Sequence, residues 1–186
     1  PNHAELAIKS ALRMVEVIKA VNETHLAKGL PEIGIGIGIN TGMMCVGDMG
    51  SQERQAYTVI GDAVNLGSRL EGLSKTYGVE IVVSASTRKQ VSDYAWQELD
   101  KVRVKGKQEA VSIYSPWGLT VQISPEQQAE VKTWAQFIKA YRAQDWEQCD
   151  VLLLNIQRLH DGKFLYHLSQ ERLGSLSREA LEPQSD

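Results

Sequence analysis

The sequence lacks the features of a secreted or membrane-spanning protein. It has two cysteines, Cys45 and Cys149, which lie far apart and have no metal-like spacing. No secretory pattern begins the chain, so two such residues are most simply reduced thiols, which indicates a cytoplasmic protein. No run of apolar residues approaches the length needed to span a bilayer.

An excess of positive charge is also absent. The chain has 20 Lys and Arg residues against 23 Asp and Glu residues, a formal net charge of -3, and it has no basic run. We therefore expect no nucleic acid partner, although the local cluster of Arg103, Lys105 and Lys107 would suit a polyphosphate. A hydrophobic content of 42% over 186 residues is typical of a globular protein with one ordinary domain and a small appendage.

The first third of the chain predicts a helix and then a glycine-rich strand. Apolar residues recur at helical spacing from about Ala4 to Ala27, which predicts an amphipathic helix that ends before Gly29 and Pro31. Residues 33–39 alternate isoleucine with glycine, so a strand would carry isoleucines on one face and glycines on the other. Another backbone, a nucleotide or a dimer partner must approach that glycine face closely.

The middle of the chain predicts further strands and a second helix. The triplet 40–42 predicts a turn into a hairpin whose return strand is 43–46, followed by an exposed loop over 48–55. A strand ending at Ile60 leads into a helix with Asp62 as N-cap and Gly78 as C-cap. The other expected elements are a strand over 79–83, a short helix capped by Ser84 or Ser86 and running through Val91, and strands over 98–104 and 110–117.

The composition changes at Gly118 to Pro125, and the rest of the chain predicts helices. Apolar residues at helical intervals indicate two antiparallel helices with a break near Gln144 and Asp145, and a third helix from about Phe164 to Leu181. The first two resemble a tetratricopeptide-type helical hairpin, a family whose repeats need neighbours to bury their faces. A helical cap on the preceding domain, or a dimer contact, is the simpler interpretation.

The segment 57–71 carries the residues best suited to chemistry. Asn65 and Arg69 lie four residues apart and so share one stripe of a helix whose neighbouring stripe is apolar. A guanidinium can donate two parallel hydrogen bonds to phosphoryl oxygens, and the amide could fix a sugar or orient the arginine. By spacing alone, a solvated arginine on an amphipathic helix explains the pattern equally well.

Several separated motifs resemble, in their order, the second half of a class III nucleotide cyclase catalytic domain. They are Ile37-Gly38-Ile39-Asn40-Thr41-Gly42, Val46-Gly47-Asp48-Met49-Gly50-Ser51, Arg54, the segment 57–71 and Val104-Lys105-Gly106-Lys107. The agreement of several motifs is more specific than any single one. The resemblance implies an α+β fold with a ferredoxin-like, palm-type sheet and packed helices over residues 1–118. Residues 119–186 would form a small all-helical extension that resembles tetratricopeptide repeats.

The resemblance also implies an activity and roles for four residues. An adenylate cyclase converts ATP to 3′,5′-cyclic AMP and pyrophosphate at a site shared across a homodimer interface. In the family, residues matching Asn65 and Arg69 act on the ribose and on the transition-state phosphate, and the one matching Lys105 contacts the triphosphate. Thr58 falls at the base-selecting position, where a subset of bacterial adenylate cyclases has threonine and guanylate cyclases usually have cysteine. A hydroxyl can both donate to and accept from adenine, although Thr58 would also suit an ordinary strand and Lys105 a solvated hairpin tip.

The metal-binding part of the family pattern is missing from this sequence. Class III cyclases hold two Mg²⁺ or Mn²⁺ ions with two aspartates, which lie upstream of a helix like the one that opens this chain. Neither aspartate motif is present. Asp48 follows a glycine and is interpreted as a turn residue, so no metal ligand is assigned here. We expect the chain by itself to be inactive, and the parent protein to carry an upstream sensor or membrane domain.

Three other functions remain open at this point. A guanylate cyclase would differ in base selection, and Thr58 argues against it. A regulatory, cyclase-like domain that binds nucleotide without activity is opposed by the intact Asn65 and Arg69. A diguanylate cyclase shares the palm-like sheet, but its active-site signature is absent.

Overall fold

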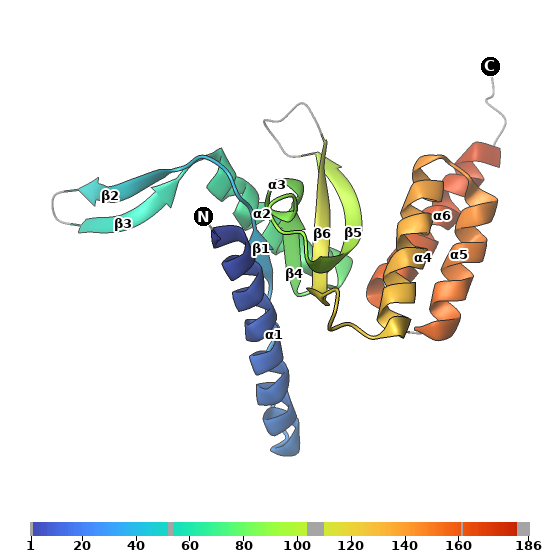
Figure 1. Cartoon of the computed structure of the whole chain (residues 1–186), viewed down its shortest axis with the longest axis horizontal. Coiled ribbons are helices and arrows are strands. Elements are labelled where there is room, and N and C mark those ends of the chain that lie inside the picture. The colour runs from blue at the N-terminus through green and yellow to red at the C-terminus, as the bar shows by residue number, and fades with distance from the viewer. Residues whose placement is uncertain (1, 52–53, 104–109, 161, 182–186) are drawn as a thin grey trace. The chain divides into compact units, whose positions relative to one another are not determined.

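The computed structural model describes residues 2–51, 54–103, 110–160 and 162–181 (Figure 1). The chain forms two compact units. Unit 1 comprises Pro1–Tyr94 and Leu99–Pro116, and unit 2 comprises Ala95–Glu98 and Trp117–Asp186. The assignment of a cyclase domain to 1–118 and of an extension to 119–186 stays a prediction. Among the described residues, none of the helices combines the length and apolar character needed to cross a membrane.

A four-stranded sheet with packed helices forms the core of the fold. Its strand order is β1 (Ile37–Ile39), β4 (Ile81–Ser84), β6 (Ala110–Leu119) and β5 (Tyr94–Arg103). β1 runs parallel to β4, whereas β4 runs antiparallel to β6, so the sheet is mixed. The helices of unit 1 are α1 (His3–Ala27), α2 (Asp62–Tyr77) and the short α3 (Ala85–Arg88). This arrangement confirms the predicted α+β class.

The glycine face of β1 packs directly against α2. A Cβ atom added at Gly38 would lie 2.2 Å from the carbonyl oxygen of Gly67 and 2.3 Å from the backbone nitrogen of Glu71. A Cβ atom at Gly36 would lie 2.5 Å from Ser74 Oγ. Of the possibilities left open by the sequence, close approach of another backbone therefore accounts for this part of the face. The strand is shorter than predicted: β1 begins at Ile37, and residues 33–36 precede it.

The predicted hairpin at residues 40–42 is wrong, and so is the predicted loop at the described residues 48–51 and 54–55. β2 (Cys45–Ser51) instead pairs antiparallel with β3 (Arg54–Ile60) in a separate two-stranded sheet, with Gly47 opposite Thr58. The polar composition of 48–55 is typical of a loop, but it also suits a hairpin whose described side chains face solvent. The chain after β1 does not return along the sheet, because the Asn40 side chain is bonded to the start of α2.

The caps of α2 and α3 partly match the prediction. Gly61, with φ of 146°, is the N-cap of α2, so the prediction of Asp62 was wrong and Asp62 is the first helical residue. Gly78 ends α2 in the left-handed conformation, with φ of 63°, as predicted. Ser84, one of the two predicted caps, begins α3 by accepting a hydrogen bond from the backbone N–H of Thr87, but the helix ends at Arg88 and not at Val91 as predicted.

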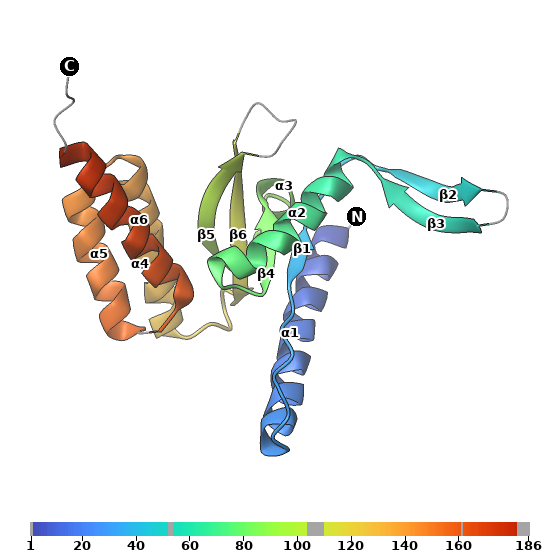
Figure 2. The ribbon, with the colours of Figure 1, turned by 180° about the vertical axis from the view of Figure 1, so that it is seen from behind.

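Three helices make up most of unit 2, as the apolar periodicity predicts. They are α4 (Pro125–Arg142), α5 (Trp146–Leu159) and α6 (Phe164–Leu181), and they lie side by side in both ribbon views (Figures 1 and 2). α4 begins at a capping box formed by Ser124 and Gln127. The break between α4 and α5 occurs at Gln144, whose φ is 57°. The likeness to a tetratricopeptide hairpin stays a prediction.

Candidate functional site

The helix α2 presents one buried and one exposed side. Leu66, Leu70 and Tyr77 are at most 4% exposed and fix the helix in the core of unit 1. Asn65 and Arg69 are both exposed. Residues four apart on a helix are neighbours on its surface, with about 5–6 Å between their Cβ atoms. The structure thus brings these two candidate site residues together on the accessible side of a well-packed helix.

The first turn of α2 is anchored from the segment that follows β1. Asn40 Nδ2 donates a hydrogen bond to the carbonyl oxygen of Ala63 over 2.8 Å. Ser86 Oγ in turn donates to Asn40 Oδ1 over 3.0 Å. A Cβ atom at Gly42 would lie 2.8 Å from that of Ala63, so the chain runs close against the helix start. Asn40 therefore connects the start of α2 with α3.

A group of hydroxyls extends this connection into the core. Ser86 Oγ lies 2.8 Å from Ser84 Oγ, which lies 3.2 Å from Thr87 Oγ1, and Thr87 Oγ1 lies 3.0 Å from Thr41 Oγ1. Ser84 and Thr87 are fully buried. This set was not predicted from the sequence. The run of hydroxyl residues after a buried strand was the one feature of the sequence that could have indicated it. The partner Asn40 could not be found in this way, because it lies 46 residues away from Ser86.

Thr58 lies on the hairpin and not on the central sheet. It is on β3, opposite Gly47 of β2, and it is exposed together with both of its neighbours, Tyr57 and Val59. β3 ends at Ile60 and leads through one glycine into α2, and the two elements are in contact. Thr58 is thereby joined to the helix that carries Asn65 and Arg69 by a short, well-defined segment.

One residue assigned from the sequence is not placed by the structure. Lys105 lies outside the described residues, between β5 and β6, so its role stays a prediction. In the part of the chain that the structure describes, no group of three or more His, Cys, Asp or Glu side chains could hold a metal ion. Asp48 is exposed and lies within β2, opposite Tyr57, so its interpretation as a turn residue was wrong.

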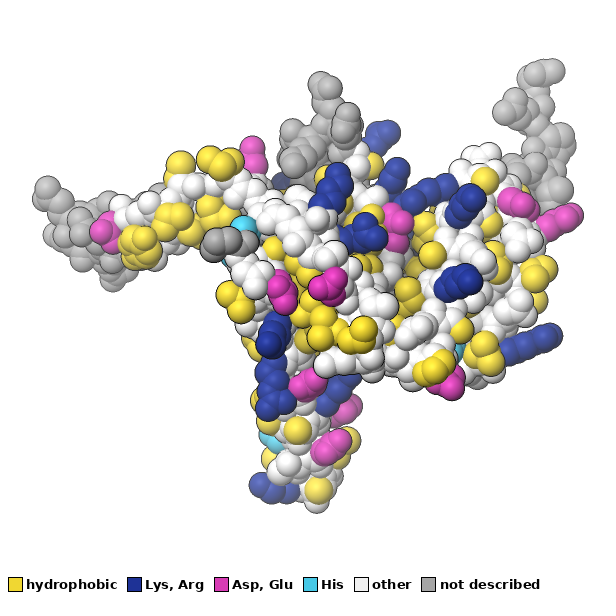
Figure 3. Space-filling model, viewed as in Figure 1, with side chains coloured by type: hydrophobic (Ala, Val, Ile, Leu, Met, Phe, Trp, Pro, Cys, Tyr) yellow, Lys and Arg dark blue, Asp and Glu magenta, His cyan; other side chains and the backbone are white. Residues whose placement is uncertain are grey.

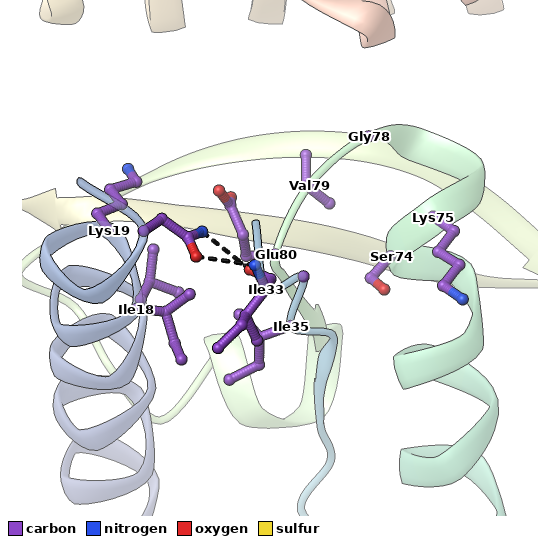
Figure 4. Close-up of a pocket in the computed structure, with 12 residues that line it drawn as sticks. Ile18, Lys19, Ile33, Ile35, Ser74, Lys75, Gly78, Val79 and Glu80 are labelled. Carbon is purple, nitrogen blue, oxygen red and sulfur yellow. Dashed lines mark hydrogen bonds between the residues drawn. The ribbon is translucent and has the colours of Figure 1, made fainter. Parts of the chain in front are cut away.

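A cavity of about 280 Å³ lies elsewhere in unit 1 (Figure 4). Ile18 and Lys19 of α1, Ile33 and Ile35 line one part of it, and the C-terminal end of α2 lines another. Asn22 of α1 bonds the helix to the segment that carries Ile33. Its side-chain amide donates to the carbonyl oxygen of Ile33 and accepts from the backbone N–H of the same residue. Thr58, Asn65 and Arg69 do not line this cavity.

The family model and the similar proteins all indicate one family. Residues 1–115 match the model of the adenylate and guanylate cyclase catalytic domain. Adenylate cyclase 1 of Rhizobium meliloti is 40% identical over 118 residues, which are 63% of this chain and 18% of that protein. An adenylate cyclase of Anabaena cylindrica is 39% identical over 120 residues, which are 60% of this chain and 24% of that protein. The chain thus spans less than a quarter of these relatives.

Solved structures show the same fold. The adenylyl cyclase CyaB from P. aeruginosa has a TM-score of 0.52 and 28% identity, and the match covers 63% of this chain and 62% of that one. The catalytic core of a rhodopsin-guanylyl cyclase with converted specificity, in complex with ATPαS, has a TM-score of 0.51 and 31% identity, over 61% of this chain and 59% of that one. With more than half of its residues matched to the family model, this chain belongs to the adenylate and guanylate cyclase catalytic domain family.

Proposed function

We propose that this chain is part of an adenylate cyclase, which converts ATP to 3′,5′-cyclic AMP and pyrophosphate at a site shared by two protomers. The observation that carries the proposal is the presentation of Asn65 and Arg69 on the exposed side of a helix whose other side is buried. Adenine as the base is supported by the adenylate cyclases among the relatives, at about 40% identity, and by the hydroxyl of Thr58.

Arg69 and Asn65 have the chemistry that the reacting groups need. In the proposed reaction the ribose 3′ hydroxyl attacks the α-phosphorus of ATP, and the bond to pyrophosphate breaks. The Arg69 guanidinium donates parallel hydrogen bonds to the equatorial oxygens of the five-coordinate phosphorus, where negative charge gathers. Asn65 binds the ribose one helical turn away, which aligns the attacking hydroxyl.

Thr58 and Lys105 bind the two ends of the nucleotide in this proposal. The Thr58 hydroxyl both donates and accepts, so it can pair with the amino group or a ring nitrogen of adenine. The Lys105 ammonium attracts the triphosphate, and exposed Arg103 at the end of β5 adds positive charge to that part of the chain. Both groups contribute affinity and orientation.

The described residues do not supply a ligand set for the two divalent ions that class III cyclases use. Mg²⁺ and Mn²⁺ prefer carboxylate oxygens that converge from one site, and Asp48 is an isolated, exposed carboxylate on β2. We therefore place the metal-binding aspartates on a part of the parent protein upstream of this sequence, where a sensor or membrane domain is also proposed. The chain by itself should form no appreciable cyclic AMP.

The hairpin of β2 and β3 is proposed to contact the second protomer. Six exposed apolar residues lie on it or at its base, and the space-filling view shows hydrophobic side chains gathered there (Figure 3). This hairpin patch consists of Met43, Met44, Val46, Tyr57, Val59 and Ile60. Met43 is 94% exposed and Tyr57 is 76% exposed. Exposed apolar surface of this extent is typical of a protein interface, and Thr58 lies within it.

Sedimentation of the chain tests the interface. Substituting Met43 and Tyr57 together with lysine should shift a dimer to monomer, because two charges would have to be desolvated in the contact. The matched control is Val121→Lys, which changes an equally exposed apolar residue (89%) in unit 2 and should leave the dimer intact. A dimer that survives the double substitution would exclude the hairpin patch as the interface.

A guanylate cyclase is the second candidate, because the family model that matches residues 1–115 covers both adenylate and guanylate cyclases. The two are separated by measuring cyclic nucleotide formation from ATP and from GTP, with Mn²⁺, using the polypeptide extended upstream to its natural start. We expect cyclic AMP, and Thr58→Ala should reduce the preference for ATP over GTP. Thr76→Ala, an exposed threonine near the end of α2, is the control and should change neither rate. Cyclic GMP as the main product would overturn the assignment of adenine.

A further inference from the structure

Asn40 lies where three parts of unit 1 meet, and it has no role in the chemistry described above. We propose that Asn40, held by Ser86, is a positioning residue of the cyclase reaction, because it fixes the first turn of α2 and with it the orientation of Asn65 and Arg69. This inference rests on the proposed function of Asn65 and Arg69. It goes beyond that proposal by adding two residues that act through the helix and not through the nucleotide.

The first turn of α2 has little of its own to hold it. Its N-cap is Gly61, which has no side chain to accept a hydrogen bond from the free backbone N–H groups of that turn. Helix ends without such a cap fray readily. Asn65 lies in the first turn, so fraying would move it directly, and it would also loosen the turn on which Arg69 lies.

Asn40 holds the first turn from the side of the helix, through a carbonyl oxygen and not through the free N–H groups. Its Nδ2 donates to the carbonyl oxygen of Ala63, two residues before Asn65, over 2.8 Å. The bond is partly buried, so water competes for it less than at the surface. The Asn40 Cβ also lies 4.0 Å from the position of a Cβ added at Gly67, so the side chain lies along the stripe of the helix that carries Ala63 and Gly67.

The Ala63 carbonyl oxygen, which can only accept, sets which way the Asn40 amide points, and Ser86 holds the other end of the amide. Ser86 Oγ donates to Asn40 Oδ1 over 3.0 Å, which leaves Nδ2 directed at Ala63. Ser86 Oγ is itself 2.8 Å from Ser84 Oγ, and Ser84 is fully buried at the end of β4. The anchor is therefore connected to β4 of the central sheet.

The catalytic consequence follows from the geometry that phosphoryl transfer requires. A displacement of about 1 Å in a catalytic group can cost on the order of a hundredfold in rate. Substituting Asn40 with alanine removes the bond to Ala63 and should lower kcat for cyclic AMP formation by about tenfold or more. The KM for ATP should change much less, because base and triphosphate contacts are made elsewhere.

Activity measurements on the upstream-extended polypeptide separate the contributions of Asn40 and Ser86 to kcat. Asn40→Asp keeps the size of the side chain but loses the donor to Ala63, so it should be as impaired as Asn40→Ala. Ser86→Ala should lower kcat, whereas Ser86→Thr keeps the hydroxyl and should retain activity. The control is Asn22→Ala, another asparagine of unit 1 whose side chain makes two hydrogen bonds, both with the backbone of Ile33, and it should leave kcat unchanged. Wild-type kcat in Asn40→Ala, or equal losses in Asn22→Ala, would overturn the inference.

A double substitution shows whether Asn40 acts through Arg69. In an Arg69→Ala background, Asn40→Ala should cost less activity than it does in the wild type, because one of the two groups that it positions is already gone. Losses that multiply in full would contradict the positioning role. Wild-type activity in Arg69→Ala alone would instead refute the proposed function.

Amide hydrogen exchange measures how firmly the first turn of α2 is held, independently of any activity. The amides of residues 64–69 should exchange faster in Asn40→Ala than in the wild type, and they should not change in Asn22→Ala. Unchanged exchange over 64–69 in a folded Asn40→Ala protein would overturn the inference whatever the activity shows.

Discussion

Lys163 Nζ donates a hydrogen bond to Glu130 Oε1 over 2.7 Å, although the Glu130 side chain is only 1% exposed. The Tyr166 hydroxyl donates to the same carboxylate oxygen, and His160 Nε2 lies 3.2 Å from the other one. Burial, followed by the bond to Glu130, raises the pKa of Tyr166 well above its usual range. Gln97 Nε2 donates to Tyr166 Oη, so the network extends to β5. One carboxylate on α4 thus connects α4 with the start of α6 and the end of α5.

Replacing Glu130 should destabilise unit 2 severely. Glu130→Ala removes the acceptor of two hydrogen bonds and leaves the Tyr166 hydroxyl buried with a lost partner, which typically costs about 3 kcal/mol. Urea unfolding followed by tryptophan fluorescence measures the change. Glu147→Ala, an exposed glutamate on α5, should change the free energy of unfolding by less than about 1 kcal/mol. Equal stabilities of the two variants would contradict a structural role for the buried carboxylate.

Cys149 should make the protein less stable at alkaline pH. Burial, with a smaller contribution from Asp145 and Asp150, raises the pKa of the Cys149 thiol to about 11. In the unfolded chain the thiol ionises near its ordinary value of about 8.5. Between these values the unfolded state binds fewer protons, so stability falls as pH rises, and below about pH 8 this effect is absent.

Unfolding measured from pH 7 to pH 11 tests this dependence. Cys149→Ala should lose part of the alkaline decline, whereas Cys45→Ala, at an exposed position, should keep all of it. Other groups titrate equally in the three proteins, so the difference between them is the informative quantity. An identical pH dependence in Cys149→Ala and the wild type would exclude the thiol as its source.

The close contact between β1 and α2 should make Gly38 intolerant of a side chain. A methyl group there would overlap the backbone of α2, which cannot shift without moving the helix, and overpacking of this kind costs about 1–3 kcal/mol. Gly72→Ala is the matched control on α2. It meets no atom within 4 Å, so alanine should stabilise the helix by about 0.5–1 kcal/mol. Thermal unfolding of the two variants should give shifts of opposite sign.

The parts of the fold that the sequence predicts are those that depend on local patterns. Helical periodicity predicted α1, α2 and the three helices of unit 2, because each buries one stripe of apolar residues. Gly78 and Ser84 were predicted as caps because their local chemistry suits those positions. Asn65 and Arg69 share the exposed side of α2 for the same reason, since four residues make about one turn.

The features that the sequence did not reveal depend on contacts distant along the chain. The β2 and β3 hairpin was missed because exposed strands can be as polar as a loop, and amino-acid composition does not determine which strands pair. Asn40 fits a turn by residue type, but its partner Ala63 lies 23 residues away. Asp62 was preferred as N-cap by side-chain chemistry, whereas the positive φ at this point required Gly61.

The most direct test of the central claim is cyclic AMP formation from ATP by the upstream-extended polypeptide and by its Arg69→Ala variant. The proposed role predicts cyclic AMP from the wild type and a rate about two to three orders of magnitude lower in the variant, because a transition-state hydrogen-bond donor has been removed. Lys75→Ala, an exposed cation near the end of the same helix, should retain the wild-type rate. Equal rates in Arg69→Ala and the wild type, or no cyclic nucleotide from a folded dimer, would contradict it.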